Sequence, residues 1–479
     1  MSDAEIGFLP ASELAVHYRN KSLSPVEVID AVLRHVDRQE PALNAMALVT
    51  ADLARATAKQ AEAAFMRGDA RRLEGVPVTI KDLQQTKGIR TEMGSRMFEG
   101  HFPDVDAPCV TRLRDAGCVM IGKTTTPEFG WKGVSQSPLT GITHNPWQHG
   151  LSAGGSSSGA GAGAAAGYGP LHQGGDGAGS VRIPAHMCGV FGMKPTHGRV
   201  PNWPMSNNDL ATHIGPITRT VTDAALMLEA MAGPHVWDYT SLEAAPQDYA
   251  SQLPATLRGK RIAFSPDLGH ARVDGDVAKL VVRAVGAFEQ MGATIEPVTP
   301  AWGPVGPELF DFFWPATFSG RLRFLPEWED RLDPGLVAMI KTTKNLKVSE
   351  FMVMRERRFA YCQTIHELFQ DWDFLLTPAV STPAFPAHLL QPEHWPQHPW
   401  DGLSWAQFSY PFNWAGNPAV SVPCGFTATG LPVGLQIVGR RFDDLGVLQA
   451  SHAFEQARPW ASRRPPLANQ PPENAHAAP

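Results

Sequence analysis

Apolar positions recur with a helical period over the first part of the chain. From Val28 to Val36 they return every three or four residues, and Ser24 with Glu27 forms a capping box just before them. The segment 51–67 is rich in Ala, Lys, Glu and Arg, which favour helix. We therefore expect residues 1–70 to form a helical segment that packs on the core.

Beyond residue 70, runs of β-branched and aliphatic residues that predict strands alternate with amphipathic stretches that predict helices. The expected strands are 75–81, 118–121, 261–265, 294–298, 374–378, 420–422 and 435–438. The expected helices are 108–116, 222–231, 276–291, 349–372 and 445–456. This alternation is typical of an α/β fold. We expect a single large domain over residues 71–464, with a central mixed β-sheet flanked by helices.

Two further segments stand out by composition. Residues 300–344 concentrate aromatic side chains and prolines, and because aromatic residues chiefly serve packing, we expect most of them in the core. Residues 465–479 are rich in Pro, Ala and Asn, so we expect them to form a disordered tail.

The overall composition is that of an ordinary globular protein, with 43% of the 479 residues hydrophobic and 18% charged. A net charge of −6 without a Lys/Arg-rich run offers no basic surface for nucleic acid. Five cysteines without a CxxC pair suggest neither a disulfide framework nor a zinc site. Neither a signal peptide nor an apolar run of about 18 residues is visible. We therefore expect a cytoplasmic protein without a membrane partner.

Candidate chemistry concentrates in residues 152–196, where glycine, alanine and serine are so dense that few side chains could fill a core. Ser156 lies in Gly-Gly-Ser-Ser-Ser and Ser180 in Gly-Ala-Gly-Ser-Val-Arg, 24 residues later. The glycines around them allow peptide N–H groups to approach a ligand closely. This pattern indicates a nucleophilic serine beside an oxyanion pocket made of main chain.

Other motifs in the sequence are weaker. Residues 117–124 match the P-loop pattern, but the four residues between its glycines form a predicted strand and could not cradle phosphate. Residues 155–159 match GxSxG, yet no apolar strand precedes them, as a nucleophile elbow would require. Nothing in the spacing selects a catalytic histidine among the four near the glycine-rich stretch, which are His172, His186, His197 and His213.

The glycine-rich stretch resembles the signature of the amidase signature family, in which a Gly-Gly-Ser-Ser run, an Asp in a Gly-rich turn, a nucleophilic Ser and Arg-x-Pro follow at this spacing. The similarity extends to Gly75-Val-Pro-Val-Thr-Ile-Lys-Asp82 upstream, to residues 413–425 downstream and to residues 430–439. It covers nearly the whole chain. The resemblance implies an amidase fold and hydrolysis of carboxylic amide C–N bonds without a metal or an organic cofactor.

The resemblance also implies a catalytic triad. Lys81 matches the family's lysine base, Ser156 the bridging serine in a cis peptide, and Ser180 the nucleophile. Lys81 must be neutral to act as a base, and since the ordinary pKa of a lysine is about 10.4, burial must lower that pKa by about 3 units.

The remaining site residues follow from the same matches. Gly177, Ala178 and Gly179, with Ser180, match the family's backbone oxyanion hole. Ser157, Asp176 and Arg182 match positions that support the catalytic residues, although Asp176 and Arg182 could equally form a purely structural ion pair. Gly130 and Trp131 match the wall of the substrate channel.

The substrate is expected to be a small amide with a hydrophobic or aryl part, an anilide, or an aryl carbamate (a urethane). The aromatic residues Trp131, Trp203, Trp405, Phe408, Tyr410, Phe412 and Trp414, together with Met205, would make such a pocket apolar. The alternative is the glutaminase component of a tRNA-dependent amidotransferase. In that protein an Asp recognises the amino group of glutamine, whereas Ala406 stands at the matching position here. We expect the protein to be a monomer or a homodimer.

Overall fold

The strands that the sequence predicts assemble into one large sheet in a computed structural model of the chain, which describes residues 1–243 and 248–466. The sheet contains 11 strands in the order β1-β3-β2-β8-β10-β9-β14-β15-β13-β11-β12. These strands are β1 (Met46–Val49), β2 (Pro77–Lys81), β3 (Val119–Thr124), β8 (Leu171–Asp176), β9 (Phe191–Lys194), β10 (His213–Thr218), β11 (Arg261–Phe264), β12 (Thr294–Pro297), β13 (Phe374–Pro378), β14 (Ala419–Phe426) and β15 (Pro432–Gly439).

The sheet is mixed. β2 runs parallel to both β3 and β8, and β11 runs parallel to both β12 and β13. The strands between these two parallel groups pair antiparallel. Two small hairpins lie outside the sheet, formed by β4 (Gln136–Ser137) with β5 (Gly141–Ile142) and by β6 (His144–Asn145) with β7 (Gln148–Ser152).

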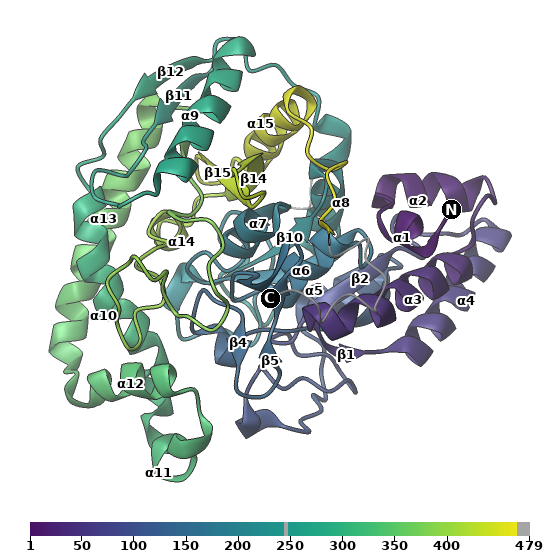
Figure 1. Ribbon diagram of the computed structural model, residues 1–479, viewed down its shortest axis with the longest axis horizontal. Coiled ribbons are helices and arrows are strands. Elements are labelled where there is room, and N and C mark those ends of the chain that lie inside the picture. Colours follow the sequence, from purple (N-terminus) through teal and green to yellow (C-terminus); the bar gives the residue numbers. More distant parts are fainter. Residues whose placement is uncertain (244–247, 467–479) are drawn as a thin grey trace.

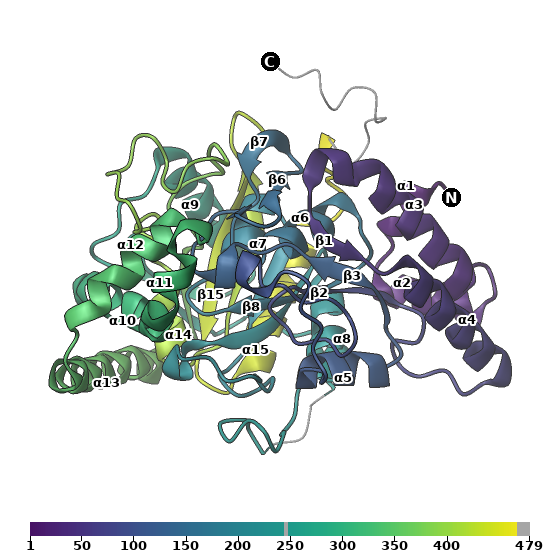
Figure 2. The same cartoon turned by 90° about the horizontal axis from the view of Figure 1, so that it is seen from below.

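Helices cover the sheet and both of its ends (Figures 1 and 2). The N-terminal helices α1 to α4 lie at one end, and α10 to α13 lie at the other. The helices are α1 (Asp3–Gly7), α2 (Ala11–Arg19), α3 (Pro25–Leu43), α4 (Ala51–Arg67), α5 (Pro108–Asp115), α6 (Ser158–Ala166), α7 (Arg182–Cys188), α8 (Val221–Met231), α9 (Gly275–Gln290), α10 (Gly306–Phe318), α11 (Leu325–Trp328), α12 (Pro334–Thr342), α13 (Val348–Asp371), α14 (Tyr410–Trp414) and α15 (Asp444–Ala457). Among the described residues, no helix has the length and apolar character that crossing a bilayer requires.

The centre of the molecule is built from very small residues. Helix α6 reads Ser-Gly-Ala-Gly-Ala-Gly-Ala-Ala-Ala, and every one of its residues is buried. A Cβ on Gly161 would lie 2.8 Å from the side chain of Pro184 in α7, and a Cβ on Gly159 would overlap the carbonyl of Ala45. The absence of side chains here lets α6 pack directly on neighbouring backbone, which a helix of larger residues could not do.

The expected α/β fold with a central mixed sheet is confirmed, and each expected strand and helix has a counterpart. Four strands of the sheet were not expected, namely β1, β8, β9 and β10. β1 lies inside the segment expected to be helical and pairs antiparallel with β3. The other three contain glycine, proline or polar residues, which are depleted in strands and hide the strand pattern.

The C-terminal tail is only partly described. Residues 467–479 of the expected disordered tail lie outside the described residues, whereas Pro465 is buried. Just before it, the guanidinium of Arg464 lies 4.3 Å from the centre of the Phe8 ring. Chain segments from the two ends of the sequence therefore lie side by side.

Candidate active site

Lys81 and Asp176 lie at the same edge of the sheet, because they end the neighbouring parallel strands β2 and β8. Both side chains border a cavity of about 170 Å³, and Ser156 and Ser180 border it as well. The three residues matched to the triad therefore come together from β2 and from the loops before α6 and α7.

Lys81 has the environment that a lysine base requires. Its side chain is fully buried, and its Nζ lies 2.8 Å from Ser156 Oγ and 3.0 Å from Ser157 Oγ. Burial lowers the pKa of Lys81 from 10.5 to about 7, although the negative charge of Asp176 acts in the opposite direction. A large fraction of Lys81 is thus neutral near pH 7, as a lysine base requires.

The two serine loops are joined through their backbones and through Ser157. The Gly155–Ser156 peptide bond is cis, as the resemblance implied. The N–H of Ser157 donates to the carbonyl of Ser180 at 3.1 Å. Ser157 Oγ donates to the carbonyl of Gly175 and accepts from its N–H, both at 3.2 Å. Ser157 therefore ties the Ser156 loop to the end of β8 while it contacts Lys81.

Asp176 and Arg182 form a buried ion pair behind the turn between β8 and α7. Two nitrogens of Arg182 donate to the two carboxylate oxygens of Asp176, each at 3.0 Å. Burial raises the pKa of Asp176, but the charge and hydrogen bonds of Arg182 and the amide of Asn413 outweigh it and hold the pKa below its ordinary value. The ionised pair fixes the turn that carries Ser180.

The same carboxylate changes the expected oxyanion hole. The N–H of Gly179 donates to Asp176 Oδ1 at 2.6 Å, and the N–H of Val181 donates to Oδ2 at 3.1 Å. The Gly179 donor is therefore occupied, contrary to its expected role. Within the described chain, the N–H groups of Gly177, Ala178 and Ser180 have no hydrogen-bond acceptor.

Gly130 borders the cavity as expected, in a turn with an unusual backbone. Phe129 and Gly130 both have positive φ, at 53° and 71°. A Cβ on Gly130 would lie 2.9 Å from Ser156 Oγ, so the position leaves no room for a side chain. Next to them, the Glu128 carboxylate accepts from Ser95 Oγ at 2.6 Å and from the N–H of Asp333 at 2.7 Å, which anchors this turn to the start of α12.

Trp131 does not line the cavity, which corrects the expectation for this residue. Its side chain is 1% exposed and packs in a hydrophobic cluster with Leu336 and Trp405. Its main chain contacts a residue of the cavity wall, because its carbonyl accepts a hydrogen bond from Nε1 of Trp314 at 2.9 Å.

The aromatic wall comes from other residues than those expected. Phe129, Trp314 and Phe318 border the cavity, whereas Trp203, Met205, Trp405, Phe408, Tyr410, Phe412 and Trp414 do not. Trp314 and Phe318 belong to the segment 300–344, whose aromatic residues were expected mainly in the core. Both are indeed buried, but α10 places them at the cavity beside Lys81 and Asp176. Composition could not show which aromatic residues only pack in the core and which also border the cavity, because these two side chains do both.

The discounted motifs have structural roles. Lys123, in the P-loop-like segment, is buried in β3 and donates to Gln84, Thr86 and Thr91. None of His172, His186, His197 and His213 borders the cavity. Among the described residues, no three His, Cys, Asp or Glu side chains are arranged to hold a metal ion.

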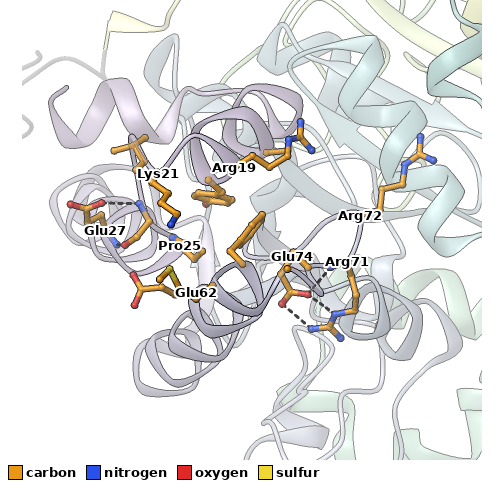
Figure 3. A pocket seen from close by; sticks show the side chains of 16 residues that line it. Arg19, Lys21, Pro25, Glu27, Glu62, Arg71, Arg72 and Glu74 are labelled. Carbon is orange, nitrogen blue, oxygen red and sulfur yellow. Dashed lines mark hydrogen bonds and ion pairs between the residues drawn. The ribbon is translucent and has the colours of Figure 1, made fainter.

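A second cavity, of about 670 Å³, lies between α2, α3, α4 and the loop that follows α4 (Figure 3). Its rim carries charges of both signs, including the ion pair of Arg71 with Glu74 at 2.6 Å. It contains none of the residues matched to the triad, so it is separate from the candidate active site.

The chain is similar to known proteins over nearly its whole length. The family model described as Amidase matches residues 27–448. An acylamidase of Rhodococcus erythropolis is 39% identical over 97% of this chain and 98% of its own length. A glutamyl-tRNA(Gln) amidotransferase subunit of Geotalea daltonii is 32% identical over 97% of this chain and its whole length. The crystal structure of a bacterial aryl acylamidase superposes with a TM-score of 0.89 at 28% identity, covering 97% of this chain and 99% of the other.

Proposed function

Because this chain belongs to the amidase signature family and is therefore an amide hydrolase, we propose that it cleaves amides with a hydrophobic or aryl part through a Ser180–Ser156–Lys81 relay. One observation carries the proposal. Nζ of a buried lysine with a pKa of about 7 lies 2.8 Å from Ser156 Oγ, in a cavity that Ser180 also borders.

In the proposed reaction, Ser180 Oγ attacks the substrate carbonyl carbon while its proton passes to Ser156 and the Ser156 proton passes to neutral Lys81. The carbonyl oxygen becomes an oxyanion that the N–H groups of Gly177, Ala178 and Ser180 stabilise. When the C–N bond breaks, the relay returns a proton to the leaving nitrogen. Water then attacks the acyl-enzyme through the same relay and releases the acid.

The walls of the cavity favour an apolar or aryl substrate over glutamine. Phe129, Trp314 and Phe318 supply aromatic surface. The charged residues that border the cavity are Lys81 and Asp176, and Asp176 is already paired with Arg182. Among the described residues, no further carboxylate borders the cavity to bind the amino group of glutamine, and Ala406 is buried in a hydrophobic cluster. Anilides are the simplest substrates of this kind, and aryl carbamates and esters pass through a similar acyl-enzyme.

The test measures release of the aniline from simple acyl anilides by the wild type, Ser180→Ala and Lys81→Ala, with glutamine as a parallel substrate. We expect kcat to fall by about 10⁴-fold or more in both variants, since residues of such a relay act as a unit. Ser158→Ala is the matched control, because this serine begins α6 two residues after Ser156 and its buried Oγ has no partner within the described chain.

Glutamine turnover without anilide turnover would favour the amidotransferase component instead. Anilide turnover that persists in Ser180→Ala would show that Ser180 is not the nucleophile. Equal losses in Ser158→Ala would show that any change at the start of α6 disturbs the site.

A further inference from the structure

Large apolar side chains gather on an exposed loop after α8, a feature that the catalytic chemistry does not explain. Val236 is 92% exposed, Tyr239 is 85% exposed and Trp237 is 46% exposed. The ring of Trp203 lies against Trp237, with ring centres 4.7 Å apart. We call Trp203, Val236, Trp237 and Tyr239 the aromatic platform. Exposed apolar clusters of this kind usually mark a binding surface.

The platform is held in a fixed shape by a buried carboxylate. Asp238 is only 2% exposed, although it lies between the exposed residues Trp237 and Tyr239. Its Oδ1 accepts from the N–H and the hydroxyl of Thr240, and its Oδ2 accepts from the N–H of Asn202 at 2.9 Å. The loop therefore presents its aromatic side chains to solvent on a hydrogen-bonded frame. Figure 2 shows this loop protruding at the lower edge of the molecule, below α8.

The same frame connects the platform to the catalytic cavity. Asn202 and Pro204 both border that cavity, and Trp203 lies between them in the chain. The Asp238–Asn202 hydrogen bond joins the platform loop to the cavity wall directly. The aromatic platform is thus an outward continuation of one side of the active site.

The small size of the cavity indicates a role for the aromatic platform. Cavities that enclose a drug-sized ligand measure about 300–1000 Å³, whereas this cavity measures about 170 Å³. A substrate larger than a simple anilide must therefore extend beyond it. Rigid aromatic side chains bind apolar groups with little loss of conformational entropy.

We propose that the aromatic platform binds the distal apolar part of extended amide substrates, whose scissile bond lies at Ser180. The proposal rests on the proposed function and deepens it. It makes the enzyme selective for amides whose apolar part reaches outside the cavity, and it assigns the binding of that part to Trp237 and Tyr239.

The test compares acetanilide with two longer anilides, one extended on the aniline ring by a 4-benzyloxy group and one extended on the acyl side as a 6-phenylhexanoyl group. The variant is Trp237→Ser/Tyr239→Ser. We expect kcat/KM for at least one long anilide to fall about tenfold through a higher KM, with kcat/KM for acetanilide within twofold of wild type. The matched control is Phe102→Ser, since Phe102 is 61% exposed, does not belong to the platform and does not border the cavity.

A second measurement needs no turnover and separates this proposal from the proposed function. In Ser180→Ala, the long anilide should change the intrinsic tryptophan fluorescence and bind more tightly than acetanilide, and Trp237→Ser should remove that advantage. Equal affinity of Ser180→Ala for short and long anilides would overturn the platform, whether or not the wild type hydrolyses anilides. Equal kinetic losses for all three substrates would also overturn it. A change of oligomeric state in the double variant, seen by size-exclusion chromatography, would overturn it as well, because the platform would then be an interface between copies of the chain.

Discussion

Lys81 has a fully buried amine whose hydrogen-bond partners are two hydroxyl groups and a carbonyl group. Because burial lowers its pKa to about 7, the neutral form grows as pH rises through 7. We predict that kcat/KM increases tenfold per pH unit below pH 7 and levels off above about pH 8.

A pH profile of anilide hydrolysis between pH 5 and 9 checks this prediction. The residual activity of Lys81→Ala should not show the tenfold change in kcat/KM per pH unit below pH 7. A flat wild-type profile would mean that Lys81 is not the group whose ionisation controls catalysis.

Gly130 tests how closely the site is packed. A Cβ at this position would contact Ser156 Oγ at 2.9 Å, and the positive φ of 71° adds backbone strain. We predict that Gly130→Ala lowers kcat at least 100-fold, because the bridging serine must move. Gly88→Ala is the matched control, since Gly88 has a φ of 70° but no atoms within 4 Å of its ideal Cβ. A comparable loss of kcat in both variants would attribute the effect to strain alone.

At the residue scale, the sequence selected the proposed triad because each of its members lies inside a specific motif, and the structure brings the three residues to one cavity. It did not predict that Gly179 donates to Asp176, since that depends on how the turn folds back on the carboxylate. The sequence also failed to predict the position of Trp131. Nothing in the residues around it shows whether its side chain faces the cavity or packs behind the cavity wall.

At the element scale, the turn between β8 and α7 is stabilised by the buried ion pair of Asp176 and Arg182. Removing Asp176 leaves the guanidinium of Arg182 buried without its carboxylate, which typically costs about 3–5 kcal/mol. We predict this loss for Asp176→Ala in denaturant unfolding, and a fall in kcat of about 100-fold where the protein folds. Asp176→Asn, which keeps the hydrogen-bond acceptor and the shape, should be less damaging.

An exposed ion pair provides the control for this prediction. Glu308 and Arg357 pair at 2.6 Å, with side chains that are 62% and 42% exposed. Glu308→Ala should therefore cost less than about 1 kcal/mol. Similar losses for the two carboxylates would contradict the structural role given to Asp176.

Some helices and strands have a clear apolar pattern in the sequence, and others do not. Helices α3 and α9 have clear apolar periods, and strands β13 and β15 are buried apolar runs. The positions of α9, α13, β13 and β15 were predicted to within a few residues. Strands β8, β9 and β10 lie in the middle of the sheet, but glycines and prolines that permit close backbone contacts interrupt their patterns.

In the whole molecule, Arg219 connects the N-terminal helices to the catalytic core. It is 6% exposed and donates to the carbonyls of Ala164 and Gly169 on one side and of Gly7 on the other. We predict that Arg219→Met, which leaves these acceptors unsatisfied, lowers the free energy of unfolding by about 2–4 kcal/mol. It should also speed cleavage within the first 20 residues in limited proteolysis.

Arg38→Met is the control, since Arg38 is 40% exposed and pairs with Asp3 on the same N-terminal helices. It should change the unfolding free energy by less than about 1 kcal/mol. Unchanged proteolysis in Arg219→Met would mean that the N-terminal helices are held by their apolar contacts alone.

The order of the 11 strands could not be predicted from the sequence, because it is set by pairings between distant segments. β13 pairs with β15 and β11, and β9 pairs with β14, more than 200 residues away. Local patterns report which segments form strands, but not which distant segments meet. The fold class was therefore predictable from the sequence of helices and strands, whereas the order of the strands in the sheet was not.

The small-residue helix α6 restricts how this enzyme can change over evolutionary time. Its positions already hold some of the smallest amino acids, so almost every mutation there adds volume to a region with no space for it. Random mutagenesis should therefore recover few active variants in residues 158–166. New substrate preferences should instead arise in the surrounding loops and in α10, where side chains can shrink as well as grow.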